Sequence, residues 1–173
     1  MNKFANLAGA AALVLGSAAA FAADGPSDPE IAHIAYTAGA LDVAAGQQAL
    51  AKSHNAAVRA FAEEMVRDHK AVNDQALALV KKLNVTPEDN PTSQALSKAA
   101  ADKLAELDKL DGAAFDKAYI DNEVAYHKAV NSALADTLIP AAQNAELKSL
   151  LETGLKLFQE HQTHAEHLAK HIH

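Results

Sequence analysis

Residues 144–172 read NAELKSLLETGLKLFQEHQTHAEHLAKHI, and the spacing of apolar residues in this stretch identifies the fold class. Apolar and small residues recur at alternating intervals of four and three, the pattern of one face of an α-helix packed in a bundle. This face comprises Leu147, Leu151, Gly154, Phe158, His161, Ala165, Leu168 and Ile172. Asn144 precedes it as a helix N-cap. His161 is therefore expected on the buried face of a predicted helix.

The same periodicity recurs upstream and predicts an all-α protein. The other long helices are predicted over residues 29–52, 55–83 and 113–138, and Asn55 is the expected N-cap of the second of these. A shorter helix over 94–107 follows a linker over 84–93. Pro140 is expected to end the helix over 113–138. Four long helices with one additional short helix in the central connection predict a four-helix bundle made of two antiparallel hairpins.

A histidine or carboxylate interrupts the apolar face of every long helix. The inward positions are Asp42, His69, Glu123, His127 and His161, and Asp68 lies at the edge of its helix face. Helical bundles build metal sites from such inward side chains, and imidazole and carboxylate groups are ligands for copper, zinc and iron. The pattern predicts a buried site for one of these metals. The alternative is a polar network of Asp–His and Glu–His pairs that stabilises the bundle.

Histidines are also concentrated at the C-terminus. His164, His167 and His171 follow one another at intervals of three and four, so they lie along one edge of the predicted helix. Adjacent imidazoles on such an edge can chelate copper, nickel or zinc. Alternatively, they form a solvated edge whose protonated form interacts favourably with the C-terminal end of the helix dipole.

The N-terminus predicts export. Met1-Asn2-Lys3 is a short basic region, an apolar run over 4–15 follows, and Ala20-Phe21-Ala22 fits a cleavage site, so residues 1–22 are predicted as a signal peptide. Residues 23–173 are then expected to form a single domain that is periplasmic or secreted. The apolar run is shorter than the roughly 20 residues of a membrane span, and no second such run follows.

The composition limits the ligands and partners that the protein is expected to bind. The chain contains no cysteine, which excludes disulfides, thiolate ligands and a nucleophilic thiol. Its 22 acidic and 15 basic residues give a formal charge of −7, so a basic surface for nucleic acid is not expected. Metal ions, a second copy of the chain and an envelope protein remain as predicted partners.

Two further segments carry a family resemblance. AAVRAFAEEMVRDH over residues 56–69 and FDKAYIDNEVAYH over 115–127, followed by His161, resemble exported bacterial proteins classed as domain of unknown function 4142. The resemblance covers residues 31–171. It implies a ferritin-like helical bundle, often described as a predicted outer-membrane protein, with no settled activity. His69, His127 and His161 are the histidines that match the family pattern.

The resemblance raises the question of di-iron chemistry, which the residues disfavour. Ferritin-like di-iron sites use Glu-x-x-His on two helices, and none of His69, His127 and His161 has a glutamate three positions before it. The preferred hypothesis is a periplasmic metal-binding bundle for metal handling or envelope stress protection, rather than an enzyme. A non-catalytic structural or interaction protein of the envelope is the alternative, and a divergent ferritin-like redox enzyme is the third.

Overall fold

The computed structural model describes residues 25–172, and within them every regular element is helical. The predicted signal peptide over 1–22 lies outside the described residues. The elements in chain order are α1 (Asp28–Lys52), α2 (Ala56–Lys82), α3 (Pro91–Asp108), α4 (Gly112–Ala133), the π-helix η1 (Leu134–Leu138), α5 (Ile139–Ala141) and α6 (Ala145–Ala169). The all-α prediction is confirmed.

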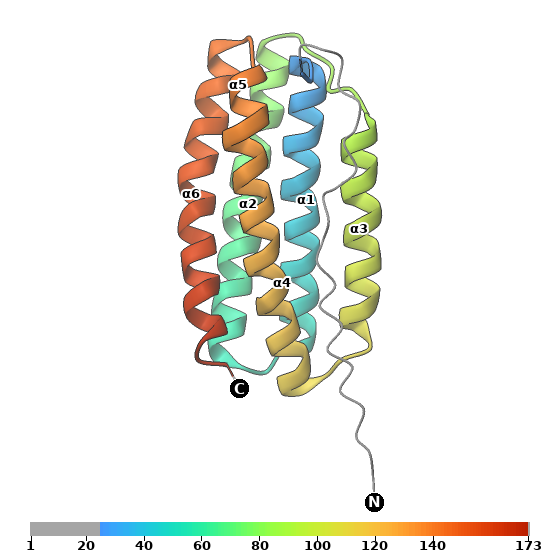
Figure 1. Cartoon of the computed structure of the whole chain (residues 1–173), viewed down its shortest axis with the longest axis vertical. Coiled ribbons are helices and arrows are strands. Elements are labelled where there is room, and N and C mark those ends of the chain that lie inside the picture. Colours follow the sequence, from blue (N-terminus) through green and yellow to red (C-terminus); the bar gives the residue numbers. More distant parts are fainter. Residues whose placement is uncertain (1–24, 173) are drawn as a thin grey trace, which may run out of the picture.

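The long helices lie side by side with roughly aligned axes (Figure 1). Helix α1 packs chiefly on α2, and α4 packs on α6, while contacts between α2 and α6 join the two pairs. Helix α3 packs on α1 at the edge of this assembly (Figure 1). None of the described helices is both long enough and apolar enough to cross a membrane. The specific likeness to ferritin stays a prediction from the resemblance.

Asparagine side chains begin α2 and α6. The Asn55 side chain accepts hydrogen bonds from the backbone N–H groups of Ala57 and Val58, at 2.9 and 3.4 Å. Asn144 accepts from Glu146 and Leu147 in the same way, at 2.9 and 3.1 Å. These bonds satisfy N–H groups that have no partner inside the helix. Both predicted caps are confirmed.

Helix α3 is longer than predicted. It begins at Pro91 and ends at Asp108, whereas the sequence predicted a linker as far as residue 93 and a helix over 94–107. Asn90 and Ser93 form a reciprocal capping box, and Pro91 occupies the first helical position, where its missing N–H costs nothing. Pro91 therefore starts this helix instead of lying within the linker.

Pro140 does not end the helix that precedes it. The chain continues from α4 through η1 and α5 to Ala141. The N–H of Ile139 bonds to the carbonyl of Leu134, five residues earlier, so the helix widens by one residue at this point. A π-turn of this kind rearranges the backbone where proline cannot take part in the regular hydrogen-bond ladder.

The apolar core has two parts with a polar layer between them. One part contains Phe61 and Met65 of α2, Phe115 and Tyr119 of α4, and the C-terminal third of α6. The other part comes from α1, η1 and the N-terminal part of α6, with one residue between α5 and α6; its buried members are Ile31, Ile34, Leu134, Leu138, Ala142, Leu147, Leu151 and Phe158. The inward polar residues fall between the two sets along each helix.

The buried face of α2 shifts after His69. The spacing of Phe61, Met65 and His69 predicts that this face continues through Val72 and Leu79. These two side chains are only half-buried, and Asn73 and Val80 are buried instead. Asn73 packs against Gly39 of α1, where a methyl group would lie 2.4 Å from the Asn73 Oδ1 atom. Glycine at position 39 thus allows a polar side chain to occupy the interface of α1 and α2.

Candidate metal centre

Five side chains from four helices meet in the polar layer. We call Asp42 of α1, His69 of α2, Glu123 and His127 of α4, and His161 of α6 the central cluster. Each is at most 2% exposed. Ligand atoms of His69, His127 and His161 lie within 4.8 Å of one another, as do those of Asp42, Glu123 and His127. All five inward positions inferred from the helical period are therefore brought together.

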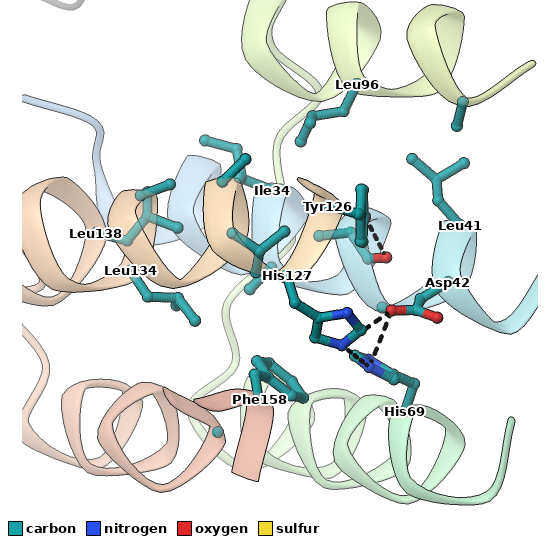
Figure 2. Close-up of a pocket in the computed structure, with 18 of the residues that line it drawn as sticks. Ile34, Leu41, Asp42, His69, Leu96, Tyr126, His127, Leu134, Leu138 and Phe158 are labelled. Carbon is teal, nitrogen blue, oxygen red and sulfur yellow. Dashed lines mark hydrogen bonds and ion pairs between the residues drawn. The ribbon is translucent and has the colours of Figure 1, made fainter. Parts of the chain in front are cut away.

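Asp42 and the two nearest imidazoles form the tightest part of the central cluster (Figure 2). The Asp42 Oδ2 atom lies 3.1 Å from His69 Nε2 and 3.4 Å from His127 Nε2. The two Nε2 atoms are themselves 3.4 Å apart. Three potential ligand atoms from three helices thus face one point.

The backbone orients His127. Its Nδ1 lies 3.1 Å from the backbone carbonyl oxygen of Glu123, one helical turn earlier. A carbonyl only accepts, so Nδ1–H is the donor and a neutral His127 carries its lone pair on Nε2. This arrangement, in which one ring nitrogen is fixed by a hydrogen bond and the other is bare, is typical of metal-ligating histidines.

His161 is oriented by a carboxylate. Its Nε2 donates to Asp68 Oδ2 at 3.1 Å, and Asp68 in turn accepts two hydrogen bonds from Arg67, at 2.7 and 3.0 Å. The remaining His161 Nδ1 is buried and has no hydrogen-bond partner in the described part of the chain. Asp68, predicted at the edge of the helix face, therefore contacts a ring of the central cluster from outside it.

The pKa values of the two carboxyl groups in the central cluster are shifted in opposite directions. Burial raises the pKa of Asp42, but the opposing effects of His69, His127 and His161 together outweigh it, so the net pKa lies below the usual value. Burial is the main reason that the pKa of Glu123 is raised well above its usual range, and the negative charge of Asp42 adds to this effect. Of these two groups, Asp42 is therefore the one that favours the ionised form.

His127 and His161 favour their neutral form. Burial lowers the pKa of His127 to about 4, against an upward contribution from Asp42. Burial also lowers the pKa of His161, partly offset by its hydrogen bond to Asp68. Neutral imidazole is the form that binds a metal ion, so these two residues are ready to coordinate at neutral pH.

Several polar atoms of the central cluster remain without hydrogen bonds among residues 25–172. They are Asp42 Oδ1 and Oδ2, His69 Nδ1, Glu123 Oε2 and His161 Nδ1. Buried polar atoms in folded proteins are normally paired, because an unpaired one costs about 1–3 kcal/mol. A concentration of such atoms in one layer is what a site for an ion would present.

A second group lies beside the first. Glu64, Asp68 and His161 also hold ligand atoms within 4.8 Å of one another, and the two carboxylates are half-buried rather than buried. Sequence reasoning missed Glu64 because it belongs to the polar side of α2. Its i, i+4 spacing to Asp68 was the available signal.

The C-terminal histidines make different contacts. His164 Nδ1 contacts Glu64 Oε2 at 2.7 Å and its ring packs edge-on against Phe61. The rings of His167 and His171 have centroids 4.4 Å apart, on an exposed part of α6 and the turn after it. Chelation by these three residues stays a prediction.

One Glu-x-x-His sequence does occur, from Glu30 to His33 on α1, outside the central cluster. Glu30 Oε2 accepts from the backbone N–H of Ser27 in the N-terminal capping box. His33 lies 2.9 Å from the Ser93 hydroxyl and contacts α3. Glu30 therefore stabilises the start of α1, and His33 stabilises the contact of α1 with α3. Neither residue supplies a ligand to the polar layer.

The fold and the central cluster define an all-helical protein with buried histidine and carboxylate groups close enough to hold a metal ion. The chain belongs to the family of the domain of unknown function DUF4142, whose model matches residues 14–168. No curated protein and no solved structure matches the chain.

Proposed function

We propose that this protein is an exported, ferritin-like bundle that binds one transition-metal ion in the central cluster. The observation that carries the proposal is the convergence of His69, His127 and His161 within 4.8 Å, beside the Asp42 carboxylate. Four helices contribute to this layer, so occupancy by an ion would also cross-link the bundle.

The donor set favours a borderline ion. Three imidazole nitrogens and one carboxylate oxygen suit zinc, copper or ferrous iron, whereas calcium and magnesium prefer oxygen ligands alone. The Glu123 carboxyl and the Asp68–His161 hydrogen bond would act as the surrounding groups that orient ligands. We propose a role in metal handling or envelope stress protection and assign no catalytic step.

The proposed location is the periplasm. Its support is the basic, apolar and small-residue pattern over 1–22. Determination of the N-terminal residue of the protein recovered from the envelope fraction tests this part. We expect Ala23 as the first residue, and an N-terminus at Met1 would contradict export by cleavage.

Metal content is the direct test of the site. The untagged protein, purified without chelators, is analysed for zinc, copper and iron beside a His69→Ala/His161→Ala double variant. The matched control is His54→Ala, because His54 is exposed and lies between α1 and α2, outside the central cluster. We expect about one ion per chain in the wild type and the control, and loss of the ion in the double variant.

A purely structural polar network is the second candidate, and the Arg67–Asp68–His161 hydrogen bonds favour it. In that case the wild type would hold no metal and would take up none on titration with zinc, copper or iron. The double variant would then lose stability without losing any bound species.

A further inference from the structure

The central cluster is buried on every side, so an ion needs a route to reach it. Each of its five side chains is at most 2% exposed. An ion that leaves water needs a new ligand at each step, because an unpartnered charge in an apolar interior is strongly unfavourable. Two parts of the bundle border the cluster and differ in the ligands they offer: the interface of α2 and α6, and a cavity between α1, α3 and α4.

Side chains with ligand atoms lead inward across the interface of α2 and α6. Glu64 and Asp68 lie one turn apart on α2, and His161 and His164 lie one turn apart on α6. His164 Nδ1 contacts Glu64 Oε2 at 2.7 Å. Ligand atoms of Glu64, Asp68 and His161 lie within 4.8 Å of one another. Because His161 is also a member of the central cluster, the row ends at the buried site.

The exposure of these side chains falls along the row. The exposed fractions are 41% for His164, 30% for Glu64, 17% for Asp68 and 1% for His161. The outer members can meet a hydrated ion, and the His161 ring lies 5.3 Å from the His69 ring between centroids. Each step therefore offers a new ligand before the previous one is lost, and no charge is buried without a partner.

The cavity between α1, α3 and α4 offers no comparable row. It has a volume of about 400 Å³ and is lined mostly by apolar side chains, among them Ala35, Leu96 and Ala99. The charged residue that α3 contributes to its lining is Lys103, which has the same sign of charge as a metal ion. An ion on this path would lose water without gaining ligands.

Arg67 is bound to the carboxylate that an entering ion would use. Its guanidinium donates to both oxygens of Asp68, at 2.7 and 3.0 Å. The Arg67 side chain is 68% exposed, so it can turn into water at little cost when an ion replaces it. His161 also donates to Asp68, from Nε2. When an ion binds Nε2, the neutral ring carries its proton on Nδ1 instead.

We propose that a divalent transition-metal ion enters the central cluster between α2 and α6, and that Glu64, Asp68 and His161 form an outer site that binds it on the way. This inference rests on the proposed metal centre. A residue that contacts the ion only on its route changes the barrier, so it alters loading and release by the same factor and leaves the affinity unchanged. This behaviour distinguishes it from a ligand of the final site.

Glu64→Gln tests the route. The untagged metal-free protein is mixed with cobalt(II), whose visible absorption reports its ligands, and release is followed by trapping the ion with excess EDTA. We expect Glu64→Gln to slow both rates about tenfold, the effect of one charge close to a divalent ion near the surface, with unchanged affinity. The matched control is Glu63→Gln, which removes the same charge from the exposed neighbouring position and should load as the wild type does.

Arg67→Gln should have the opposite effect. It removes the cation that competes for Asp68, so we expect loading and release to become about threefold faster. Lys70→Gln removes the same charge from an exposed position one turn along α2 and is the control. Slower loading in Arg67→Gln, or equal acceleration in both variants, would show that Arg67 does not compete with the ion.

A third variant tests the other path. Ala99→Leu/Ala129→Leu fills the cavity from α3 and α4 and should leave both rates unchanged. Equal rates in Glu64→Gln and Glu63→Gln would overturn the proposed route, as would slow loading confined to the cavity variant. Weaker affinity of Glu64→Gln with an unchanged loading rate would make Glu64 a ligand of the final site instead. Absence of cobalt uptake by the wild type would overturn the metal centre and the route together.

Discussion

The ring of Phe158 lies flat on the imidazole of His69, with centroids 4.6 Å apart and planes inclined by 12°. Phe158 belongs to α6 and His69 to α2, so the stack joins the two helix pairs where the apolar core meets the central cluster. The same phenylalanine lies edge-on to His127, at 6.4 Å. It therefore holds two predicted ligands in place from one side.

Removing this ring should destabilise the protein. We expect Phe158→Ala to lower the free energy of unfolding by about 3 kcal/mol or more, because it leaves a cavity beside a buried imidazole. Phe158→Leu retains an apolar filling and should cost about 1 kcal/mol. Urea unfolding of both metal-free variants measures the difference. Equal losses would contradict this prediction, because they would show that apolar filling does not account for the contribution of the Phe158 ring.

Acid should destabilise the metal-free protein through His127. Its pKa is lowered to about 4 in the folded state, whereas an unfolded histidine titrates near 6.5. Between these values the unfolded chain binds the additional proton, so stability falls as the pH drops from 6.5 to 4. The linked change is about 3 kcal/mol for a shift of this size. His161, whose pKa is also lowered, acts in the same direction.

Glu123 acts in the opposite direction, because its pKa is raised. A carboxyl group of this kind contributes stability below its unfolded pKa, and this contribution is lost as the pH rises through the folded pKa.

A comparison of the wild type with His127→Gln in urea unfolding at pH 7 and pH 4.5 isolates the contribution of His127 to the pH dependence. NMR titration of the His127 ring gives a direct check, and a value near 6.5 would refute the prediction.

A methyl group at position 39 should separate α1 from α2. In Gly39→Ala the new Cβ would lie 2.4 Å from Asn73 Oδ1, so we expect a loss of about 1–3 kcal/mol from overpacking. Asn73→Ala removes the obstructing atom. A double-mutant cycle by thermal and urea unfolding should therefore show a clearly smaller cost of Gly39→Ala in the Asn73→Ala background. Additive effects would mean that the clash is relieved elsewhere.

The cap of α6 should contribute measurably to stability. Asn144→Ala removes the acceptor for two backbone N–H groups, and the expected cost is about 1 kcal/mol. Asn144→Asp preserves an acceptor at the same position and serves as the control. If both variants unfold at the wild-type denaturant midpoint, the side chain does not act as a cap in solution.

The central cluster was predictable because the helical repeat alone determines which residues share a face. His161 lies in an unbroken alternation of four and three, and Glu123 and His127 are one turn apart, so their burial follows from counting. Asn73 could not be found in this way. It is buried because Gly39 of another helix makes room for it, and that space is not encoded in the periodicity of α2.

Pro91 and Pro140 show the limit of local signals. Pro91 was assigned to the linker over 84–93 and Pro140 was expected to end a helix, yet Pro91 starts α3 and Pro140 lies within α5. At Pro91 the outcome depended on the Asn90–Ser93 capping box, a signal present in the sequence. At Pro140 it depended on a π-turn at Leu134–Leu138, whose buried leucines pack in the core. A tertiary contact therefore outweighed the local preference.

By itself the sequence determined the all-helical class, the two asparagine caps and the inward positions of the five polar residues, because these follow from composition, local hydrogen bonding and the 3.6-residue repeat. Only the tertiary structure decided which atoms of those residues face one another and that Glu64 and Asp68 lie beside His161. The reason is physical. Distances between side chains on different helices depend on how the helices pack, and no single-helix periodicity encodes that packing.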